Sequence, residues 1–202
     1  MKELESIYKK SFFSKRHKLQ WRAEHLCNTV IQTAKLKEGD SIIDVGCATG
    51  EFVQEFQNRK IFAYGIEGSS QALDFIPERI KEDIHIFDLR TQITASFLNA
   101  KLNVALCLEV AEHIEPEYSD IFVQNLCNLS NYIIISAAPP GQKGHYHVNC
   151  KDPGYWEMKF SDFGYVRQKG DELIWKNCLE PFKRKKGLNA YYANTLIFKK
   201  DE

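Results

Sequence analysis

The sequence has no long apolar run and no excess charge of either sign. None of its apolar stretches approaches the roughly 20 residues that a membrane-spanning helix needs, and its first residues lack the apolar core of a signal peptide. We therefore expect a cytoplasmic protein without a membrane segment. Lysine plus arginine and aspartate plus glutamate both number 27, and this balance argues against a protein that binds nucleic acid through its overall charge.

Paired cysteines are also missing. The 6 cysteines are scattered along the 202 residues, and no two of them form the C-x-x-C pair that is typical of zinc and thiol-exchange sites. We expect buried free thiols in a reducing compartment. The chain has no internal repeat and no low-complexity segment, so its length indicates one domain with a substantial core.

A phosphate-binding loop of the G-x-x-x-x-G-K-[ST] type is absent as well. What the chain does have is a strand pattern at 41–45, a turn from Gly46 to Gly50, and a helical pattern after it. Glycines let the backbone come close to a ligand, and a helix start offers unpaired N–H groups. Many nucleotide sites share this arrangement, so it predicts a nucleotide-like ligand in general terms.

Strand and helix patterns alternate along the chain. Short apolar and β-branched runs predict five strands, at 41–45, 61–66, 84–87, 104–108 and 132–136. Strands that alternate with helices favour an α/β fold with a doubly wound, mostly parallel sheet. A last strand is expected at 191–198, and because only a loop-sized connection precedes it, it should pair antiparallel at the sheet edge.

We divide the expected single domain, residues 1–202, into three parts. Residues 1–40 are expected to form a helical lid or cap, and residues 41–136 a cofactor-binding core. Residues 137–202 should supply a loop on the substrate side and the C-terminal strands. The segment 137–153 has prolines and glycines but no periodicity, and loops of this length in compact domains are usually functional.

Acidic residues stand where the expected strands end. Asp44 precedes the glycine turn, and Glu67, Asp88 and Glu109 follow the next three strands. Ligands of open parallel sheets bind beyond these strand ends. Glu67 follows the turn by about 20 residues, the spacing at which a carboxylate accepts ribose hydroxyls. Asp88 suits an exocyclic amine such as that of adenine, and the backbone of Leu89 would complete the contacts to the ring.

Together these residues resemble the motifs of class I S-adenosylmethionine-dependent methyltransferases. Asp44-x-Gly46-x-x-x-Gly50 is similar to the family's first motif, with Ala48 in place of its middle glycine, and the resemblance covers residues 41–136. It implies a seven-stranded sheet with an antiparallel last strand, S-adenosyl-L-methionine as cofactor, and methyl transfer as the activity. The cofactor-binding residues that it implies are Asp44, Gly46, Cys47, Gly50, Glu67, Asp88, Leu89 and Glu109.

The loop after the fifth strand offers one interpretation of the reacting centre. Methyl transfer from a sulfonium depends mainly on alignment and desolvation, and a base helps when the acceptor must lose a proton. His145 or His147 would be that general base, and Asn149 would orient the acceptor. In this interpretation the acceptor is a small molecule that is methylated at oxygen.

A second interpretation is a metal site formed by Glu109, Glu112 and His113, joined by His145 or His147. Mixed oxygen and nitrogen ligands suit Mg²⁺ or Mn²⁺, which would lower the pKa of acceptor hydroxyls. The E-x-x-E-H spacing is similar to an element of metal-assisted O-methyltransferases that act on the terminal ribose of RNA or on catechol-like molecules. Relatives that are not known to use metal have a similar stretch.

Two other classes of function share the turn and the ribose acid. One is an NAD-dependent oxidoreductase, although the turn lacks the full G-x-G-x-x-G pattern. The other is a non-catalytic nucleoside-binding relative, although the intact row of acids argues against a decayed site. The basic run at 183–186 is expected to be an exposed turn, without the interleaved aromatic residues of single-strand binders. The sequence leaves the oligomeric state open.

Overall fold

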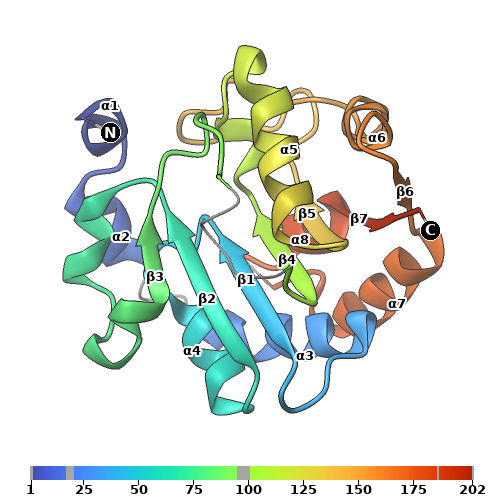
Figure 1. Ribbon diagram of the computed structural model, residues 1–202, viewed down its shortest axis with the longest axis horizontal. Coiled ribbons are helices and arrows are strands. Elements are labelled where there is room, and N and C mark those ends of the chain that lie inside the picture. Colours follow the sequence, from blue (N-terminus) through green and yellow to red (C-terminus); the bar gives the residue numbers. More distant parts are fainter. Residues whose placement is uncertain (1, 17–20, 95–100, 186, 202) are drawn as a thin grey trace.

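The computed structural model describes residues 2–16, 21–94, 101–185 and 187–201. Its centre is a seven-stranded sheet with the order β3-β2-β1-β4-β5-β7-β6 (Figure 1). The strands are β1 (Ser41–Val45), β2 (Phe62–Glu67), β3 (Ile84–Ile86), β4 (Val104–Leu108), β5 (Tyr132–Ser136), β6 (Tyr165–Arg167) and β7 (Thr195–Lys200). β7 pairs antiparallel with β5 and β6, and the other pairs are parallel. The expected α/β fold with a doubly wound sheet and an antiparallel last strand is confirmed.

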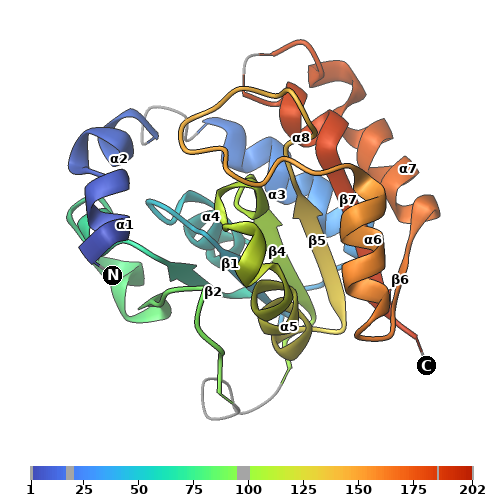
Figure 2. The ribbon, with the colours of Figure 1, turned by 90° about the horizontal axis from the view of Figure 1, so that it is seen from above.

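Two apolar cores lie on the two faces of this sheet. Helices cover the sheet from both sides (Figure 2). The first core is covered by α3 (Trp21–Ala34), α4 (Glu51–Asn58) and α7 (Lys169–Leu179), and the second by α5 (Ser119–Leu129) and α6 (Pro153–Ser161). Ile42 of β1 belongs to the first core and Ile43 to the second, because successive strand residues point to opposite faces. Central strands therefore carry apolar residues on both faces, which is what makes them recognisable in the sequence.

Two short helices precede α3. α1 (Lys2–Ile7) and α2 (Lys10–Arg16) lie beside the segment that follows β2. The side chain of Gln71, in the 3₁₀ turn Ser70–Asp74, donates to the carbonyl of Glu5 and accepts from the N–H of Lys10. The hydroxyl of Ser69 donates to the carbonyl of Tyr8. These bonds attach the N-terminal helices to the carboxyl edge of the sheet.

The C-terminal part differs from the expectation in one respect. The last strand begins at Thr195, four residues later than expected, because the preceding residues form the helix α8 (Asn189–Asn194). The carbonyl of Tyr191 in this helix accepts hydrogen bonds from the indole of Trp175 and the hydroxyl of Thr195. Tyr191 is only 3% exposed, so a buried tertiary contact overrides the strand-like pattern of its aromatic neighbours.

The remaining composition-based expectations concern membranes and thiols. Across the described residues, the structure contains no helix with the length and apolar character needed to cross a bilayer. All 6 cysteines are free thiols, and Cys27, Cys47, Cys107 and Cys127 are buried.

Candidate active site

The glycine turn joins β1 to α4 at the carboxyl edge of the sheet. Gly46 has a φ of 82°, and a Cβ atom there would lie 2.3 Å from a methyl carbon of Val110. Gly50 has a φ of 75°, and a Cβ there would lie 2.8 Å from a methyl carbon of Ile80. A side chain at either position would therefore collide with the core. Ala48 between them also has a positive φ, of 50°, so this small residue takes a glycine-like conformation.

Glu67, at the end of β2, contacts this turn directly. Its two carboxylate oxygens accept hydrogen bonds from the backbone N–H groups of Ala48 and Ser69, each at 2.9 Å. Asp44 is 4% exposed within β1. Burial, followed by the nearby charges of Asp44 and Glu67, raises the pKa of the Cys47 thiol well above its usual value. The thiol is thus protonated, and only the backbone of Cys47 is suited to contact a ligand.

A pocket, here called the turn pocket, lies between the glycine turn, the strand ends and the N-terminal helices. Its wall combines apolar side chains from α1 and α2 with carboxylates from the ends of β2, β3 and β4. The lining residues are Leu4, Tyr8, Phe12, Gly46, Ala48, Glu67, Gly68, Asp88, Leu89, Arg90, Glu109, Val110, His113, Ile114 and Glu115. An apolar enclosure with a few convergent polar groups is the usual form of a small-molecule site.

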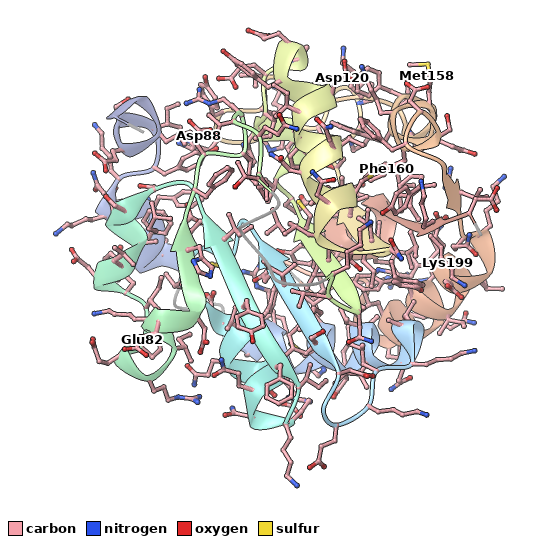
Figure 3. All side chains as sticks on the ribbon, in the orientation of Figure 1. Glu82, Asp88, Asp120, Met158, Phe160 and Lys199 are labelled. Carbon is pink, nitrogen blue, oxygen red and sulfur yellow. The ribbon has the colours of Figure 1, made fainter. Side chains whose placement is uncertain are left out.

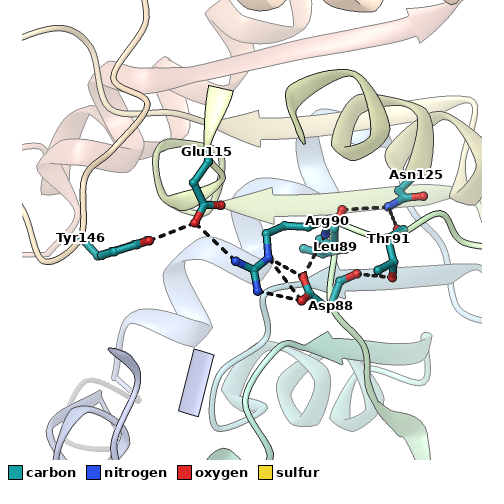
Figure 4. Close-up of polar contacts among 7 residues, drawn as sticks. All are labelled: Asp88, Leu89, Arg90, Thr91, Glu115, Asn125 and Tyr146. Carbon is teal, nitrogen blue, oxygen red and sulfur yellow. Dashed lines mark hydrogen bonds and ion pairs between the residues drawn. The ribbon is translucent and has the colours of Figure 1, made fainter. Parts of the chain in front are cut away.

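Asp88 is held by Arg90 in this pocket (Figure 4). The guanidinium donates to both carboxylate oxygens, with Nε–Oδ1 at 3.0 Å and Nη2–Oδ2 at 2.9 Å, and the backbone N–H of Arg90 donates to Oδ1. Burial alone would raise the pKa of Asp88, but the hydrogen bonds and charge of Arg90 outweigh it and lower this pKa. Asp88 is therefore an ionised acceptor.

Arg90 also connects Asp88 to the long loop after β5. Its Nη1 lies 3.4 Å from Oε1 of Glu115, and the hydroxyl of Tyr146 donates to the same oxygen at 2.9 Å. On the other side, the buried amide of Asn125 donates to the carbonyl of Leu89 at 3.1 Å. The segment after β3, where the adenine contacts were predicted, is thus fixed from both directions.

Glu109 follows β4 in a strained conformation. Its φ of 57° is unusual for a residue with a side chain. The hydroxyl of Ser136 accepts from its N–H at 2.8 Å and donates to its carboxylate at 2.9 Å. Such strain persists only where the surroundings hold it, and it occurs often at functional sites.

A second pocket, here called the histidine pocket, adjoins the first. Its lining residues are Phe12, Arg22, Glu109, Glu112, His113, His145, His147, Gly187, Ala190 and Tyr191. Phe12, Glu109 and His113 line both pockets. The histidine pocket therefore brings the two predicted loop histidines together with the predicted metal ligands. Its back wall comes from α3, which belongs to the segment 1–40 expected as a lid or cap, and from α8, where a strand was expected.

Two imidazoles in this pocket are oriented by backbone carbonyls. Nδ1 of His113 lies 3.0 Å from the carbonyl oxygen of Tyr146, and Nδ1 of His147 lies 3.0 Å from that of Gln142. Because a carbonyl can only accept, Nδ1 carries the proton in each neutral ring, and Nε2 carries the lone pair. Nε2 of His147 lies 4.0 Å from a carboxylate oxygen of Glu112.

These groups also form a compact set of possible metal ligands. One ligand atom from each of Glu112, His113 and His147 lies within 4.8 Å of the others. Metal-binding histidines typically donate their other ring N–H to a carbonyl or carboxylate, and both rings here do so. Glu109 lines the same pocket but lies outside this set.

The other two loop residues have different surroundings. Nε2 of His145 lies 3.1 Å from the carbonyl oxygen of Ile7, and its ring packs against Tyr8 and Phe12. This histidine therefore joins the loop to the N-terminal helices. Asn149 is 1% exposed, and its amide donates to the hydroxyl of Ser119 at 3.0 Å. Its backbone N–H donates to the carbonyl of Glu112, so Asn149 supports the segment that carries Glu112.

Comparison with protein families gives one match. A family model described as a methyltransferase domain matches residues 16–171, a range that includes the turn, all four strand-end acids and the loop histidines. No curated protein matches the sequence.

Solved structures with the same fold are numerous. The magnesium protoporphyrin IX methyltransferase from Synechocystis PCC 6803 with bound S-adenosylmethionine is 16% identical, with a TM-score of 0.63, over 99% of this chain and 90% of that one. An S-adenosylmethionine-dependent methyltransferase from Archaeoglobus fulgidus is 16% identical, with a TM-score of 0.57, over 88% and 94%. A small RNA methyltransferase is 14% identical, with a TM-score of 0.59, over 90% of this chain and 25% of that one.

Proposed function

We propose that this chain, which belongs to the methyltransferase-domain family and is an S-adenosylmethionine-dependent enzyme, methylates an oxygen of a small molecule bound in the histidine pocket. One observation carries the proposal: the turn pocket and the histidine pocket share Phe12, Glu109 and His113 as walls. A donor in the first pocket and an acceptor in the second would meet at that boundary. Proximity of this kind is the main requirement for methyl transfer.

The turn pocket is proposed to hold the cofactor. Glu67 would accept hydrogen bonds from the ribose hydroxyls, and Asp88 would accept one from the exocyclic amine of adenine. The turn from Gly46 to Gly50 would approach the amino-acid tail. Tyr8 would cover the nucleoside from the side of α1. The carboxylates of this pocket suit a ligand with a positive charge, such as a sulfonium, better than a phosphate.

In the proposed reaction, a lone pair of the acceptor oxygen attacks the methyl carbon. The carbon–sulfur bond breaks, its electrons go to sulfur, and S-adenosylhomocysteine is left. Nε2 of His147 takes the hydroxyl proton. Its lone pair is available because Nδ1 donates to the carbonyl of Gln142, and Glu112 at 4.0 Å would stabilise the resulting imidazolium.

A metal-assisted reaction is the second candidate, and the spacing of Glu112, His113 and His147 favours it. One carboxylate and two imidazoles fit Mn²⁺ better than Mg²⁺, which prefers oxygen ligands. A bound ion would lower the pKa of an acceptor hydroxyl. The acceptor would then be a catechol-like molecule or a terminal RNA ribose, with two neighbouring hydroxyls. In this version the Nε2 lone pairs of His113 and His147 would bind the ion, and His147 would not serve as the base.

Calorimetry and labelled methyl transfer test the main proposal. We expect S-adenosylhomocysteine to bind with micromolar affinity, and labelled methyl groups to pass into the small-molecule pool of a fractionated lysate. Binding of NAD alone would contradict it, and transfer only into RNA would favour the second candidate.

Tyr155 and Lys159 on α6 have the Tyr-x-x-x-Lys spacing used by some oxidoreductases, but Lys159 pairs with Asp120 and neither residue lines the two pockets.

Electron paramagnetic resonance with Mn²⁺ separates the two candidates. A metal site predicts stoichiometric Mn²⁺ binding that Glu112→Gln weakens, and activity that a chelator removes. A histidine base predicts activity that survives the chelator and is lost in His147→Gln. Glu117→Gln is the matched control, because Glu117 is an exposed residue in the turn that precedes α5.

A further inference from the structure

The histidine pocket contains a positively charged residue as well as the carboxylates of Glu109 and Glu112. Arg22, on α3, lines the pocket and is only 9% exposed. Its Nη1 lies 3.4 Å from the carbonyl oxygen of Gly187 and 3.5 Å from the hydroxyl of Tyr191, and its guanidinium carbon lies 5.7 Å from the centre of the Tyr191 ring. Both distances lie at the long end of the range for hydrogen bonds.

The absence of a side chain at Gly187 leaves room for the Arg22 side chain. Gly187 has a φ of 88°, and a Cβ there would lie 3.1 Å from Cδ and 3.3 Å from Nη1 of Arg22. Tyr191 is fixed from behind by the indole of Trp175, which donates to its carbonyl at 2.8 Å. The cation is therefore presented by rigid elements, as a binding residue must be if it is to select a ligand.

The surface beside Arg22 is basic and aromatic. Gly187 follows the basic run at 183–186 in the sequence. Nζ of Lys185 lies 5.7 Å from the ring centre of Trp21 and 5.1 Å from that of Phe182. Trp21 is 43% exposed and precedes Arg22 on α3. The sequence has no aromatic residue within the run itself; Phe182 stands directly before it, and Trp21 comes from α3, which is far from the run in the chain.

We propose that Arg22 binds an anionic group of the methyl acceptor, either a phosphate or a carboxylate. The inference rests on the proposed function and deepens it: the acceptor is an anion whose hydroxyl lies near His147 while its charged group pairs with Arg22. A guanidinium matches the oxygens of both groups with two parallel hydrogen bonds. Polar groups at two ends of one pocket fix the direction in which a ligand binds.

Arginine side-chain NMR tests the anion site without the acceptor. Protein saturated with S-adenosylhomocysteine is titrated with inorganic phosphate and, separately, with acetate, and the Nε–H signal of Arg22 is assigned by its loss in Arg22→Lys. We expect a saturable shift of this signal, and Arg22→Gln should weaken the anion's affinity by roughly tenfold or more. Lys185→Gln is the control and should leave the affinity within about twofold.

Several outcomes would overturn the proposal. They are the absence of a saturable Arg22 shift with either anion, an unchanged affinity in Arg22→Gln, or a larger loss in Lys185→Gln, which would locate the anion on the surface. If Arg22→Gln does not fold, the titration of the wild-type protein decides. Failure of the wild-type protein to bind S-adenosylhomocysteine would contradict the proposed function instead, so the two failures are distinguishable.

The labelled product gives the second test. The methylated product should bind an anion-exchange resin at pH 7, and loss of that binding after phosphatase treatment would identify the group as a phosphate. Resistance to phosphatase would identify a carboxylate. In Arg22→Lys the KM for this acceptor should rise with little change in kcat, because the charge is kept while the paired geometry is lost. A neutral product would overturn the inference.

Discussion

At the scale of single residues, Glu109 is where the two pockets meet. It lines both of them, has a φ of 57°, and exchanges two hydrogen bonds with Ser136. The hydroxyl thus holds the carboxylate and the strained backbone together. In the proposed reaction, this keeps the carboxylate at the boundary where the donor and the acceptor would meet.

Glu67→Gln tests the cofactor role of the acid at the end of β2. An amide nitrogen would face the N–H of either Ala48 or Ser69, each of which now donates to a carboxylate oxygen. Loss of this bond and of the ribose contact should weaken S-adenosylhomocysteine binding by about ten- to a hundredfold in calorimetry. Glu82→Gln, at an exposed position (Figure 3), should leave the affinity for S-adenosylhomocysteine unchanged. An unchanged affinity in Glu67→Gln would contradict the ribose assignment.

The ion pair of Asp88 and Arg90 predicts a pH dependence of stability. The folded protein lowers the pKa of Asp88, so the pair contributes stability that is fully present above the unfolded value of about 3.9 and is lost as the pH falls through the folded pKa. Urea unfolding should therefore show the wild type to be more stable than Arg90→Met at pH 6, with a difference that shrinks below about pH 4. A difference that grew on acidification would have the wrong sign.

At the scale of elements, strands and their acids are predictable while α8 and the back wall are not. β1 and β5 are apolar on both faces, so their residues alone identify them. The strand-end acids are then predictable as one site, because parallel strands bring their carboxyl ends to the same edge of the sheet. Arg22 looks like any residue of an amphipathic helix, and its contact with Gly187 joins positions 165 apart. Only packing reveals that pair, and the same holds for the helical conformation around Tyr191.

Tyr8, directly after helix α1, leads to a testable prediction about access to the turn pocket. The ring of Tyr8 contacts those of Phe12, His113 and His145, with centres 5.1 to 6.0 Å apart. Tyr8→Ala removes all three contacts, and we expect S-adenosylhomocysteine to dissociate roughly tenfold faster in stopped-flow measurements. The exposed neighbour provides the control Lys9→Ala, which should dissociate at the wild-type rate. Equal rates in all three proteins would show that Tyr8 does not cover the ligand.

At the scale of the whole molecule, both ends of the chain contribute to a site that is built on the central strands. The N-terminal helices close the turn pocket, and α8 closes the histidine pocket. The polar series Asp88–Arg90–Glu115–Tyr146 runs from the end of β3 to the loop after β5. A ligand at Asp88 therefore has a continuous path of polar contacts to the loop that carries His147, which is a physical basis for coupling the two pockets.

Hydrogen exchange measures this coupling. Binding of S-adenosylhomocysteine to the wild type should slow exchange at the turn and also in residues 142–149. Tyr146→Phe removes the hydrogen bond to Glu115, so protection of the loop should fall by about fivefold or more while protection of the turn stays. Tyr64→Phe also removes a tyrosine hydroxyl, but on β2 and outside both pockets, so its hydrogen exchange should match that of the wild type. Equal loop protection in all three proteins would show that the series is structural only, and that cofactor and acceptor bind independently.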